Sequence, residues 1–416
     1  MKQIVIRGGV PLQGEVSIQG SKNAVLPILA ATILTNGHNV IRNCPRIADV
    51  TFMIELLRVQ GAKIHWEGNT LFVDTTHLVK APFTAASAES MRSSVFLVGA
   101  MLARFSSVCM PYPGGCVIGD RPINWHVKHL SDMGAIFCDT CDLIEARVTK
   151  LKGCQHNLVF KSVGVTENLV LAATLAEGET RIVNAALEPE IDVLCEFLAS
   201  AGAHIVREVN GDIEVIGTEA MGGGDITIPG DRIVAGTYAL ACVATNGKVF
   251  LRGAPTMHME ALIEVLNKLG ASVLITKEGL YVEHGDEIHP IDYIQTEVYP
   301  GFPTDLQSQL VTVLAKADGC SVVKEAIFSN RFRIVKQLKK MGAAIEIIED
   351  CAIINGVTKL HATDLVVEEL RGGAALVIAG ACTKGITYLD GCGYIFRGYE
   401  NICRDLTELG VRIYSE

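Results

Sequence analysis

Apolar and polar positions follow the same order six times along the chain. An alanine-rich apolar segment with helical spacing comes first. A short turn, a β-rich run and a second segment that alternates apolar and charged residues follow. A Gly-Ala-type doublet then ends each second segment, beginning at Gly61, Gly134, Gly202, Gly270, Gly342 and Gly410. The intervals of 73, 68, 68, 72 and 68 residues are steady enough to predict internal repetition.

Each repeat predicts two helices of different character. The first is apolar nearly all round, which is typical of a buried helix, and spans 24–34, 94–104, 168–176, 233–245, 307–317 and 374–383. The second, such as 259–269 or 333–341, is expected to lie between core and solvent. Its doublet glycine has the place of a helix C′ residue. A strand pair closes the repeat, for example 272–276 and 280–283 around a turn at 277–279.

Six copies with outer strands and inner helices predict an α/β protein of two domains, each with three repeats. A glycine-rich stretch at 222–230, midway along the chain, marks the expected seam. We therefore expect a first domain at 21–229 and a second at 1–20 plus 230–416. Three repeats per domain would direct six helix N-termini to an active site in the cleft between them.

Composition narrows the class of protein. The formal net charge of −10 over 416 residues argues against a general nucleic-acid surface, which needs a broad basic footprint. The 13 cysteines are odd in number and lack framework spacing, as in a reduced cytoplasmic protein. The apolar run at 4–6 is too short for a secretory signal, and that at 372–382 too short for a bilayer. We expect a cytoplasmic protein without nucleic-acid or membrane partners.

Charged residues at the starts of the apolar helices indicate ligand binding. Helix N-termini attract anions, so Lys22, Arg92 and Arg371 are unfavourable there unless an anion is also present. Ser21 and Thr304 are expected to cap their helices. Gly-Lys-Ser/Thr loops are missing, and 391–393 lacks the later glycine of a dinucleotide turn. Phosphate-bearing ligands other than those read by the common nucleotide motifs fit this pattern.

A loop at 113–122 presents Cys116 among glycines and prolines, with Arg121 five residues later. A nearby cation favours the thiolate, and glycines let backbone approach a ligand closely, so the loop is a candidate reactive site. The alternative is an ordinary turn that contains a cysteine.

Other candidates have simpler interpretations. Cys138 and Cys141 have metal-site spacing, but no second cysteine pair lies near them, so no metal site is expected. His126 and His129 are three apart on a second helix and are interpreted as part of a solvated face, and the remaining histidines show no ligand grouping. Core positions are expected for Cys195, Cys242 and Cys382.

Seven motifs spread over the whole chain resemble those of the enolpyruvyl transferases, and within them the branch that uses UDP-N-acetylglucosamine. They are Ser21-Lys22-Asn23-Ala24, Met91-Arg92-Ser93-Ser94, the Cys116 loop ending in Arg121-Pro122, Glu188-Pro189-Glu190, Phe302-Pro303-Thr304-Asp305, Asn330-Arg331-Phe332 and Arg397-Gly398-Tyr399-Glu400. The resemblance implies an inside-out α/β barrel in each domain, built from three repeated βαβαββ units. It implies transfer of the enolpyruvyl group of phosphoenolpyruvate to the sugar 3-hydroxyl of UDP-N-acetylglucosamine, with release of phosphate, as the first committed step of peptidoglycan precursor synthesis. It implies no metal and no organic cofactor.

The resemblance also assigns roles. Cys116 corresponds to the proton donor and covalent site that fosfomycin-type epoxides alkylate, and Asp305 to a candidate general base. Phosphate binding falls to Lys22, Arg121 and Arg397, carboxylate binding to Arg331 and Arg371, and a sugar contact to Asn23. The nucleotide pocket corresponds to Arg92, Pro122, Ile123, Asn124, Trp125, Lys161, Ser162, Val163, Gly164 and Ile327. An acid, a base and fixed cations are what addition to an enol ether requires.

Several positions depart from the family pattern and suggest a divergent copy. The family has Asp at Asn124, Arg at Leu187, an acidic residue at Val234, Asp at Glu369, His at Tyr299 and Tyr394, and Asp at Phe396; Lys161 is adjacent to Ser162 rather than two before it. Two alternatives stay open: the same reaction on a different nucleotide sugar, and a catalytically silent UDP-sugar-binding paralogue. Joint retention of Cys116, Lys22, Asp305 and Arg397 argues against the silent paralogue.

Overall fold

The computed structural model describes residues 3–83, 92–112, 114, 123–138, 143–285 and 287–415. The described residues fall into two compact units. The first unit comprises those from Gly20 to Pro229, and the second comprises those up to Gln19 together with those from Gly230 onward. Each unit has a hydrophobic core of its own, and no residue belongs to both cores within the described ranges.

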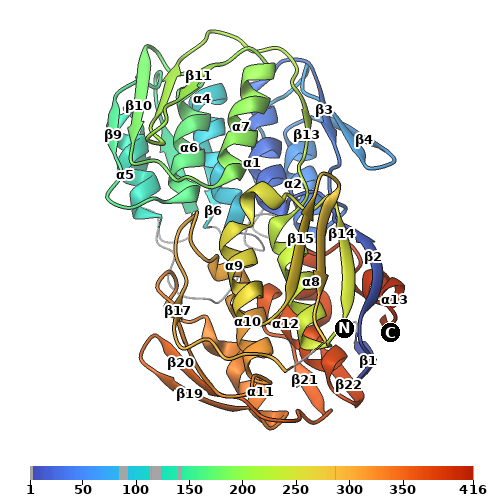
Figure 1. The fold of residues 1–416 in the computed structure, drawn as a ribbon. Helices are drawn as coiled ribbons and strands as arrows, with labels where there is room; N and C mark the ends of the chain where they lie inside the picture. Colours follow the sequence, from blue (N-terminus) through green and yellow to red (C-terminus); the bar gives the residue numbers. More distant parts are fainter. Residues whose placement is uncertain are drawn as a thin grey trace. The chain divides into compact units, whose positions relative to one another are not determined.

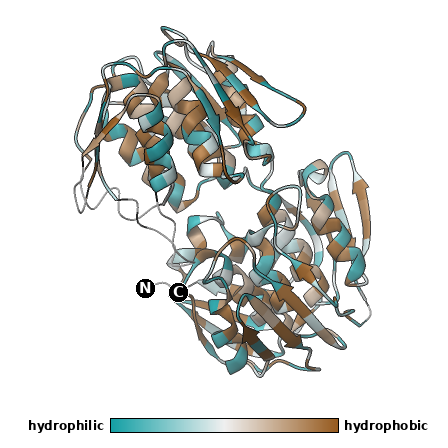
Figure 2. Ribbon diagram, turned by 90° about the vertical axis from the view of Figure 1, so that its left-hand side faces the viewer, coloured by the Kyte–Doolittle hydropathy of each residue, from teal (hydrophilic) through white to brown (hydrophobic). Residues whose placement is uncertain are grey.

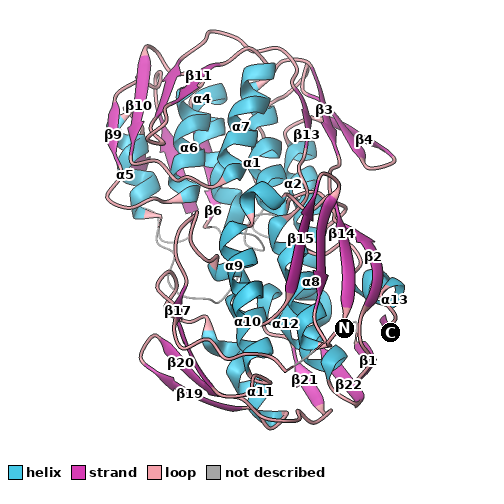
Figure 3. Cartoon of the chain, in the orientation of Figure 1, coloured by secondary structure: helices cyan, strands magenta, loops and turns pink. Residues whose placement is uncertain are grey.

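The apolar helix of each repeat is confirmed, and each is buried along most of its length. These helices are α1 (Lys22–Ala31), α4 (Phe96–Phe105) and α6 (Val163–Ala173) in the first unit, and α8 (Arg232–Ala244), α10 (Gln307–Leu314) and α12 (Leu370–Cys382) in the second. Figure 3 draws them in cyan with the magenta strands around them. Apolar segments, brown in Figure 2, run through both units.

The second helix of each repeat is amphipathic, as predicted. The set consists of α2 (Ala48–Val59), α5 (Asn124–Asp132), α7 (Pro189–Ser200), α9 (Glu260–Lys268), α11 (Val335–Lys340) and α13 (Ile402–Glu408). In α9, Leu262, Val265 and Leu266 are buried, while Glu264 and Lys268 pair at 2.7 Å on the solvent face. Short 3-10 helices are η1 (Thr32–Leu34), η2 (Arg92–Val95), η3 (Thr256–His258), η4 (Thr304–Leu306), η5 (Phe332–Ile334) and η6 (Cys392–Arg397).

The glycine of every doublet ends its helix in a backbone conformation that L-residues avoid. Values of φ lie between +90° and +106° at Gly61, Gly134, Gly202, Gly270, Gly342 and Gly410. Glycine adopts positive φ without a Cβ penalty, which explains why the same residue recurs at this place in all six repeats.

The described strands form six sheets, three in each unit. In the first unit, one sheet has the strand order β13 (Asp225–Thr227), β3 (His38–Arg42), β5 (Thr70–Asp74), β4 (Lys63–Glu67). The next has the order β6 (Ser107–Pro111), β8 (Leu143–Arg147), β7 (Ile136–Cys138). The third has the order β11 (His204–Arg207), β12 (Ile213–Ile216), β10 (Glu179–Val183), β9 (Gln155–Asn157). In the second unit, one sheet has the strand order β15 (Ser272–Thr276), β16 (Gly279–Glu283), β14 (Lys248–Arg252), β2 (Gln13–Ser17). The next has the order β17 (Ile294–Gln295), β18 (Cys320–Lys324), β20 (Cys351–Asn355), β19 (Ala344–Ile348). The third has the order β21 (Asp364–Val366), β22 (Gly385–Asp390), β1 (Ile4–Gly8), β23 (Arg412–Ser415).

The strands before α1 and α8 exchange partners. β2 precedes α1 but pairs in parallel with β14, placing Val16 opposite Leu251. β13 precedes α8 but pairs in parallel with β3, placing Ile226 opposite Ile41. β1 lies antiparallel between β22 and β23, so the blue N-terminal strand in Figure 1 completes a sheet of red C-terminal strands. Each unit therefore contains three βαβαββ-type repeats, one or two of which are completed by strands distant in sequence.

Within the described residues, no helix is both long and apolar enough to cross a membrane.

Candidate active site

The carboxylate of Asp305 is held between two buried arginines, Arg331 and Arg371, and the family resemblance assigned roles to all three residues. Asp305 lies in η4, Arg331 directly precedes η5, and Arg371 lies in the first turn of α12. Oδ1 of Asp305 accepts from Nη2 of Arg331 at 2.6 Å, and Oδ2 accepts from Nη2 of Arg371 at 2.8 Å. The arginine side chains are 2% and 4% exposed, and that of Asp305 is 26% exposed.

The two guanidiniums determine the protonation state of this carboxyl group. Burial alone would raise the pKa of Asp305, but Arg371 and Arg331 hold that pKa far below its usual range. The charge of Asp305 in turn raises the pKa of Arg371 despite the burial of the guanidinium. In this arrangement Asp305 is a stable anion and a poor proton acceptor, since a base works best with a pKa near the working pH.

The arginines keep hydrogen-bonding capacity beyond Asp305. Among the described residues, Nε of Arg331 and Nη1 of Arg371 have no hydrogen-bond partner. Buried donors are nearly always paired in folded proteins, so two unpaired guanidinium nitrogens indicate a site for an added acceptor. A carboxylate matches the planar donor geometry of arginine.

Glu325 positions two parts of this cluster and was not identified from the sequence. Its Oε2 accepts from the Thr304 hydroxyl at 2.9 Å, next to Asp305. Its Oε1 accepts from the backbone N–H groups of Ile327 at 2.9 Å and Phe328 at 3.1 Å, in the segment that leads to Arg331. The available signal was a glutamate directly after the β-rich run of β18.

Thr304 itself was predicted to be a helix cap, and this prediction is wrong. Pro303 occupies the N-cap position of η4, and no side chain makes a capping bond there. The Thr304 hydroxyl donates to Oε2 of Glu325 instead, and a hydrogen bond to a carboxylate is stronger than one between neutral groups.

The cations at helix starts have protein carboxylates beside them, which the sequence pattern did not predict. Nζ of Lys22, the first residue of α1, lies 2.7 Å from Oδ2 of Asp49 in the first turn of α2, and both side chains are largely buried. Glu369 caps α12 by accepting from the N–H groups of Arg371 and Gly372. Part of the anionic charge expected from a ligand is thus supplied by the fold. The predicted capping of α1 by Ser21 is confirmed, with Oγ accepting from the N–H of Ala24 at 3.3 Å.

Arg397 ends η6 in the same unit as Asp305 and is half-buried. The segment after it is fixed by Gln19, whose Nε2 donates to the carbonyl of Gly398 at 3.1 Å and whose Oε1 accepts from the N–H of Glu400 at 2.8 Å. Asn23, next to Lys22 in α1, is also half-buried.

The predicted nucleotide pocket residues cluster at the starts of α5 and α6, which pack together. Ile123 is buried before α5, Asn124 is exposed, and Trp125 packs edge-to-face against Phe160 with ring centroids 6.0 Å apart. Ser162 caps α6 by accepting from the N–H of Val165 at 3.4 Å. The half-exposed Lys161, Val163 and Gly164 flank this cap. Phe160, which is about half exposed, was not identified from the sequence.

Ile327, also assigned to the pocket, lies in the second unit and is exposed. Cys116, Arg121 and Pro122 lie outside the described residues, as does Cys141, and the side chain of Arg92 at the start of η2 is likewise not described. Their assigned roles stay predictions.

The interpretation of His126 and His129 as a solvated face is wrong, because both are buried. Nδ1 of His126 accepts from Nδ2 of Asn168 in α6 at 3.0 Å, and Oδ1 of Asn168 accepts from the N–H of Gly99 in α4 at 2.8 Å. His129 meets His156 of β9, so the expectation that the histidines show no grouping is also wrong. Burial and Lys128 lower the pKa of His129, and burial and His129 lower the pKa of His156 to about 4. Both rings are therefore neutral at neutral pH.

The cysteines expected in the core differ in burial. Cys242 is fully buried, which confirms the prediction, whereas Cys195 and Cys382 pack against the cores but keep some exposure. Burial raises the pKa of Cys195 and of Cys242 to about 12, so both stay protonated thiols.

Comparison with known proteins identifies the relatives of this chain. A family model described as EPSP synthase (3-phosphoshikimate 1-carboxyvinyltransferase) matches residues 6–406. UDP-N-acetylglucosamine 1-carboxyvinyltransferase 2 of Caldanaerobacter subterraneus is 42% identical over 99% of both chains. UDP-N-acetylglucosamine 1-carboxyvinyltransferase 1 of Halalkalibacterium halodurans is 39% identical over 99% of this chain and 94% of its own.

Solved structures show the same fold. The enolpyruvyl transferase NikO from Streptomyces tendae matches with a TM-score of 0.90 and 22% identity, over 100% of this chain and 98% of its own. EPSP synthase from Acinetobacter baumannii matches with a TM-score of 0.76 and 20% identity, over 100% of both chains. The predicted fold class, two α/β domains of three repeats each in the enolpyruvyl transferase fold, is confirmed.

Proposed function

This chain belongs to the enolpyruvyl transferase family and, within it, to the UDP-N-acetylglucosamine 1-carboxyvinyltransferases, and on that premise we propose its reaction. It transfers the enolpyruvyl group of phosphoenolpyruvate to the sugar 3-hydroxyl of UDP-N-acetylglucosamine and releases phosphate. This is the first committed step of peptidoglycan precursor synthesis, and we assign it to the cytoplasm. The observation that carries the proposal is the 42% identity to a transferase of that name over 99% of both chains.

The reaction is an addition followed by an elimination. A proton is added to the methylene carbon of phosphoenolpyruvate, and the sugar oxygen forms a bond to the adjacent carbon as it loses its own proton. The bond between that carbon and the phosphate oxygen then breaks, with its electron pair leaving on the phosphate. One methyl proton returns to the group that delivered the first proton, and the double bond is restored. We assign the first proton to Cys116 and the acceptance of the hydroxyl proton to Asp305, which gives the step one acid and one base.

The cluster around Asp305 suggests how substrate binding prepares the base. Arg331 and Arg371 are proposed to bind the carboxylate of phosphoenolpyruvate, and they carry unpaired donors for it among the described residues. A second carboxylate would share the positive charge that now holds the pKa of Asp305 low. The pKa of Asp305 then rises toward its ordinary range, and Asp305 becomes able to accept a proton when both substrates are bound.

The remaining assignments follow the same proposal. Lys22, Arg121 and Arg397 bind the phosphate that leaves, where fixed cations stabilise the developing charge. Asn23 contacts the sugar. The nucleotide is bound by Arg92, Pro122, Ile123, Asn124, Trp125, Lys161, Ser162, Val163, Gly164 and Ile327. Lys22 belongs to the first unit and Asp305 to the second, so the proposal assigns the reaction to residues of both units.

Phosphate release tests the substrate assignment. Purified protein is incubated with phosphoenolpyruvate and, in separate reactions, UDP-N-acetylglucosamine, UDP-N-acetylgalactosamine or UDP-glucose. Release that depends on UDP-N-acetylglucosamine is expected. Release with another UDP-sugar alone would identify a different acceptor, and no release with any acceptor would support the silent paralogue.

Two variants of the loop cysteine serve as matched controls. Cys116→Ala is expected to lose most of the turnover. Cys116→Asp is expected to keep part of it, since a carboxyl group can also deliver a proton. The Asp variant should resist alkylation by a fosfomycin-type epoxide, because a carboxylate is a weaker nucleophile than a thiolate. Equal turnover of wild type and Cys116→Ala would remove Cys116 from the mechanism.

A further inference from the structure

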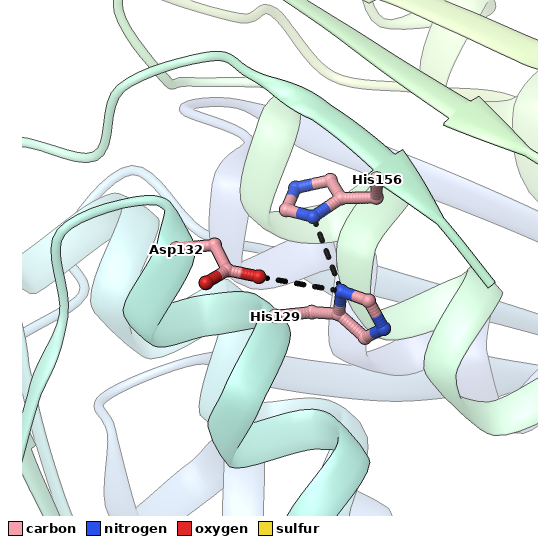
Figure 4. Close-up of side chains that lie close together, drawn as sticks. All are labelled: His129, Asp132 and His156. Atoms are coloured by element: carbon pink, nitrogen blue, oxygen red, sulfur yellow. Dashed lines mark hydrogen bonds and ion pairs between the residues drawn. The ribbon is translucent and has the colours of Figure 1, made fainter. Parts of the chain in front are cut away.

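Three metal-ligating side chains meet between α5 and β9, outside every residue assigned to the reaction. His129 and Asp132 are three residues apart on one face of α5, and His156 is the middle residue of β9. Nδ1 of His129 lies 3.3 Å from Nδ1 of His156 and 3.7 Å from Oδ2 of Asp132. Figure 4 shows both interactions converging on one nitrogen of His129.

The spacing of these atoms matches a metal coordination sphere. All three ligand atoms lie within 4.8 Å of one another. Zinc binds imidazole nitrogen and carboxylate oxygen at about 2.0–2.2 Å, so tetrahedral ligand atoms are about 3.3–3.6 Å apart. The distance of 3.3 Å between the two ring nitrogens already has that value. The side chain of Asp132 is about half exposed and can rotate to close the remaining side.

Cys154 supports the required orientation of His156. Its Sγ lies 3.4 Å from Nε2 of His156, which is the ring nitrogen opposite the one that faces His129. A proton on Nε2 that is directed to Sγ leaves Nδ1 with a free lone pair, and such a partner on the second ring nitrogen is typical of metal-bound histidine. Cys154 is therefore assigned to orient the ligand and not to bind the ion.

The two histidine ligands are buried, whereas the carboxylate ligand lies beside a lysine that competes for it. Both rings are almost fully buried, and Trp125 packs on His129 with ring centroids 6.2 Å apart. Lys128 lies 3.1 Å from Oδ2 of Asp132 and competes for that oxygen. The Lys128 side chain is mostly exposed, so it can turn into solvent when an ion takes its place.

We propose that His129, Asp132 and His156 bind one divalent ion of the zinc type, with water completing the sphere. The nitrogen-rich ligand set favours zinc and neighbouring late first-row metals over magnesium or calcium, which prefer oxygen ligands. The ion would fix the last turn of α5 to β9 and so stabilise the first unit. This site is separate from the proposed reaction, whose residues need no metal.

Metal titration of the full-length protein tests the proposal. Reduced protein freed of metal with a chelator is titrated with Zn²⁺ in a calorimeter and with Co²⁺ in a spectrophotometer. One ion per chain is expected, together with visible Co²⁺ bands of a four-coordinate site without strong sulfur-to-metal charge transfer. Zn²⁺ should also raise the unfolding temperature. Absence of stoichiometric binding would overturn the proposal.

Variants identify the ligands. Asp132→Asn changes a half-exposed side chain and is expected to weaken Zn²⁺ at least tenfold, and His156→Gln is expected to abolish binding. His65→Gln is the matched control, because His65 pairs with Glu67 at 3.7 Å on the surface of β4. The control should bind as wild type. Unchanged binding by Asp132→Asn, which does not depend on the folding of the His156 variant, would overturn the site, as would sulfur ligands in an X-ray absorption spectrum.

Discussion

At the scale of single residues, charge and burial decide both function and stability. Asp305 is ionised because Arg331 and Arg371 surround it, whereas Glu167 in α6 is a buried carboxyl group whose Oε2 has no hydrogen-bond partner in the described structure. Burial, with Glu190 and Glu188 nearby, raises the pKa of Glu167 well above its ordinary value. The pKa values of the two carboxyl groups are therefore shifted in opposite directions, and replacing each group should have a different effect on stability.

Replacing Asp305 by Asn should destabilise the second unit as well as remove the proposed base. The variant leaves two buried guanidiniums, both of which donate to Asp305 in the wild type, without this counter-charge. Breaking a buried ion pair from one side costs about 3 kcal/mol, and the partial exposure of Asp305 places this case at the low end. Urea unfolding followed by circular dichroism measures the loss. Asp318→Asn, an exposed position in the same unit, is the control and should change little. A loss no larger than that of the control would contradict the cluster.

Glu167→Gln should change how stability depends on pH. The folded protein keeps a proton on Glu167 over a pH range in which the unfolded chain has lost it. Stability therefore falls as the pH rises from the ordinary carboxyl pKa toward the raised one, by at most about 1.4 kcal/mol per pH unit for one proton. The Gln variant should lose this part of the slope and be more stable at pH 8. Glu196→Gln, exposed on α7, should keep the wild-type slope. Parallel pH profiles of wild type and Glu167→Gln would contradict the assignment.

At the scale of elements, the regular helices were predictable and the strand partners were not. The six doublet glycines could be identified because positive φ is a local constraint that one residue type satisfies. Residues 1–20 were expected in the second domain, but the pairing of β2 with β14 and of β13 with β3 depends on which sheet edge is free, and no local pattern encodes that. The same holds for His129 and His156, which are brought together only when α5 packs beside β9.

The site was predictable to a different degree. The family resemblance assigned roles to Asp305, Arg331 and Arg371, and the structure brings these three together. Apolar periodicity located the helix starts at which the cations lie. It did not predict that the carboxylates of Asp49 and Glu369 accompany these cations. Those partners come from neighbouring helices or from caps, which apolar spacing does not report.

Gly202→Ala tests the conformational role of the doublet glycines. Its φ is +106°, and among the described atoms none lies within 4 Å of an added Cβ, so any cost comes from the backbone alone. A loss of about 1–2 kcal/mol is expected in urea unfolding. Gly222→Ala in the same unit has no positive φ, and its nearest contact is 3.8 Å away, so it should be neutral. Equal effects of the two substitutions would contradict the strain argument.

At the scale of the whole molecule, each unit is built around its own core. The second core includes residues of β1 and β2, so the N-terminal strands belong energetically with residues after Gly230. The chain has two tryptophans, Trp66 in β4 and Trp125 in α5, and both lie in the first unit. Tryptophan fluorescence therefore reports the first unit, while circular dichroism reports both.

Core substitutions in the two units should separate these signals. Ile6→Ala in β1 removes a fully buried side chain of the second core and should cost about 3 kcal/mol. This substitution should shift the unfolding of the second unit, which is seen by circular dichroism, and leave the fluorescence midpoint unchanged. Ile41→Ala in β3, equally buried in the first core, should shift the fluorescence midpoint. Equal shifts of both probes in both variants would show that the units unfold as one.

The central claim is that this chain forms an enolpyruvyl ether at the sugar 3-hydroxyl. Wild-type protein is incubated with ¹³C-labelled phosphoenolpyruvate and UDP-N-acetylglucosamine, and the product is analysed by mass spectrometry and NMR. The account predicts one phosphate released per product, and a ¹³C-labelled enolpyruvyl group coupled to the carbon that bears the 3-hydroxyl oxygen. The account would be contradicted if UDP-N-acetylglucosamine stayed unchanged while a known enolpyruvyl transferase converted it under the same conditions. A label on another oxygen of the sugar would also contradict it.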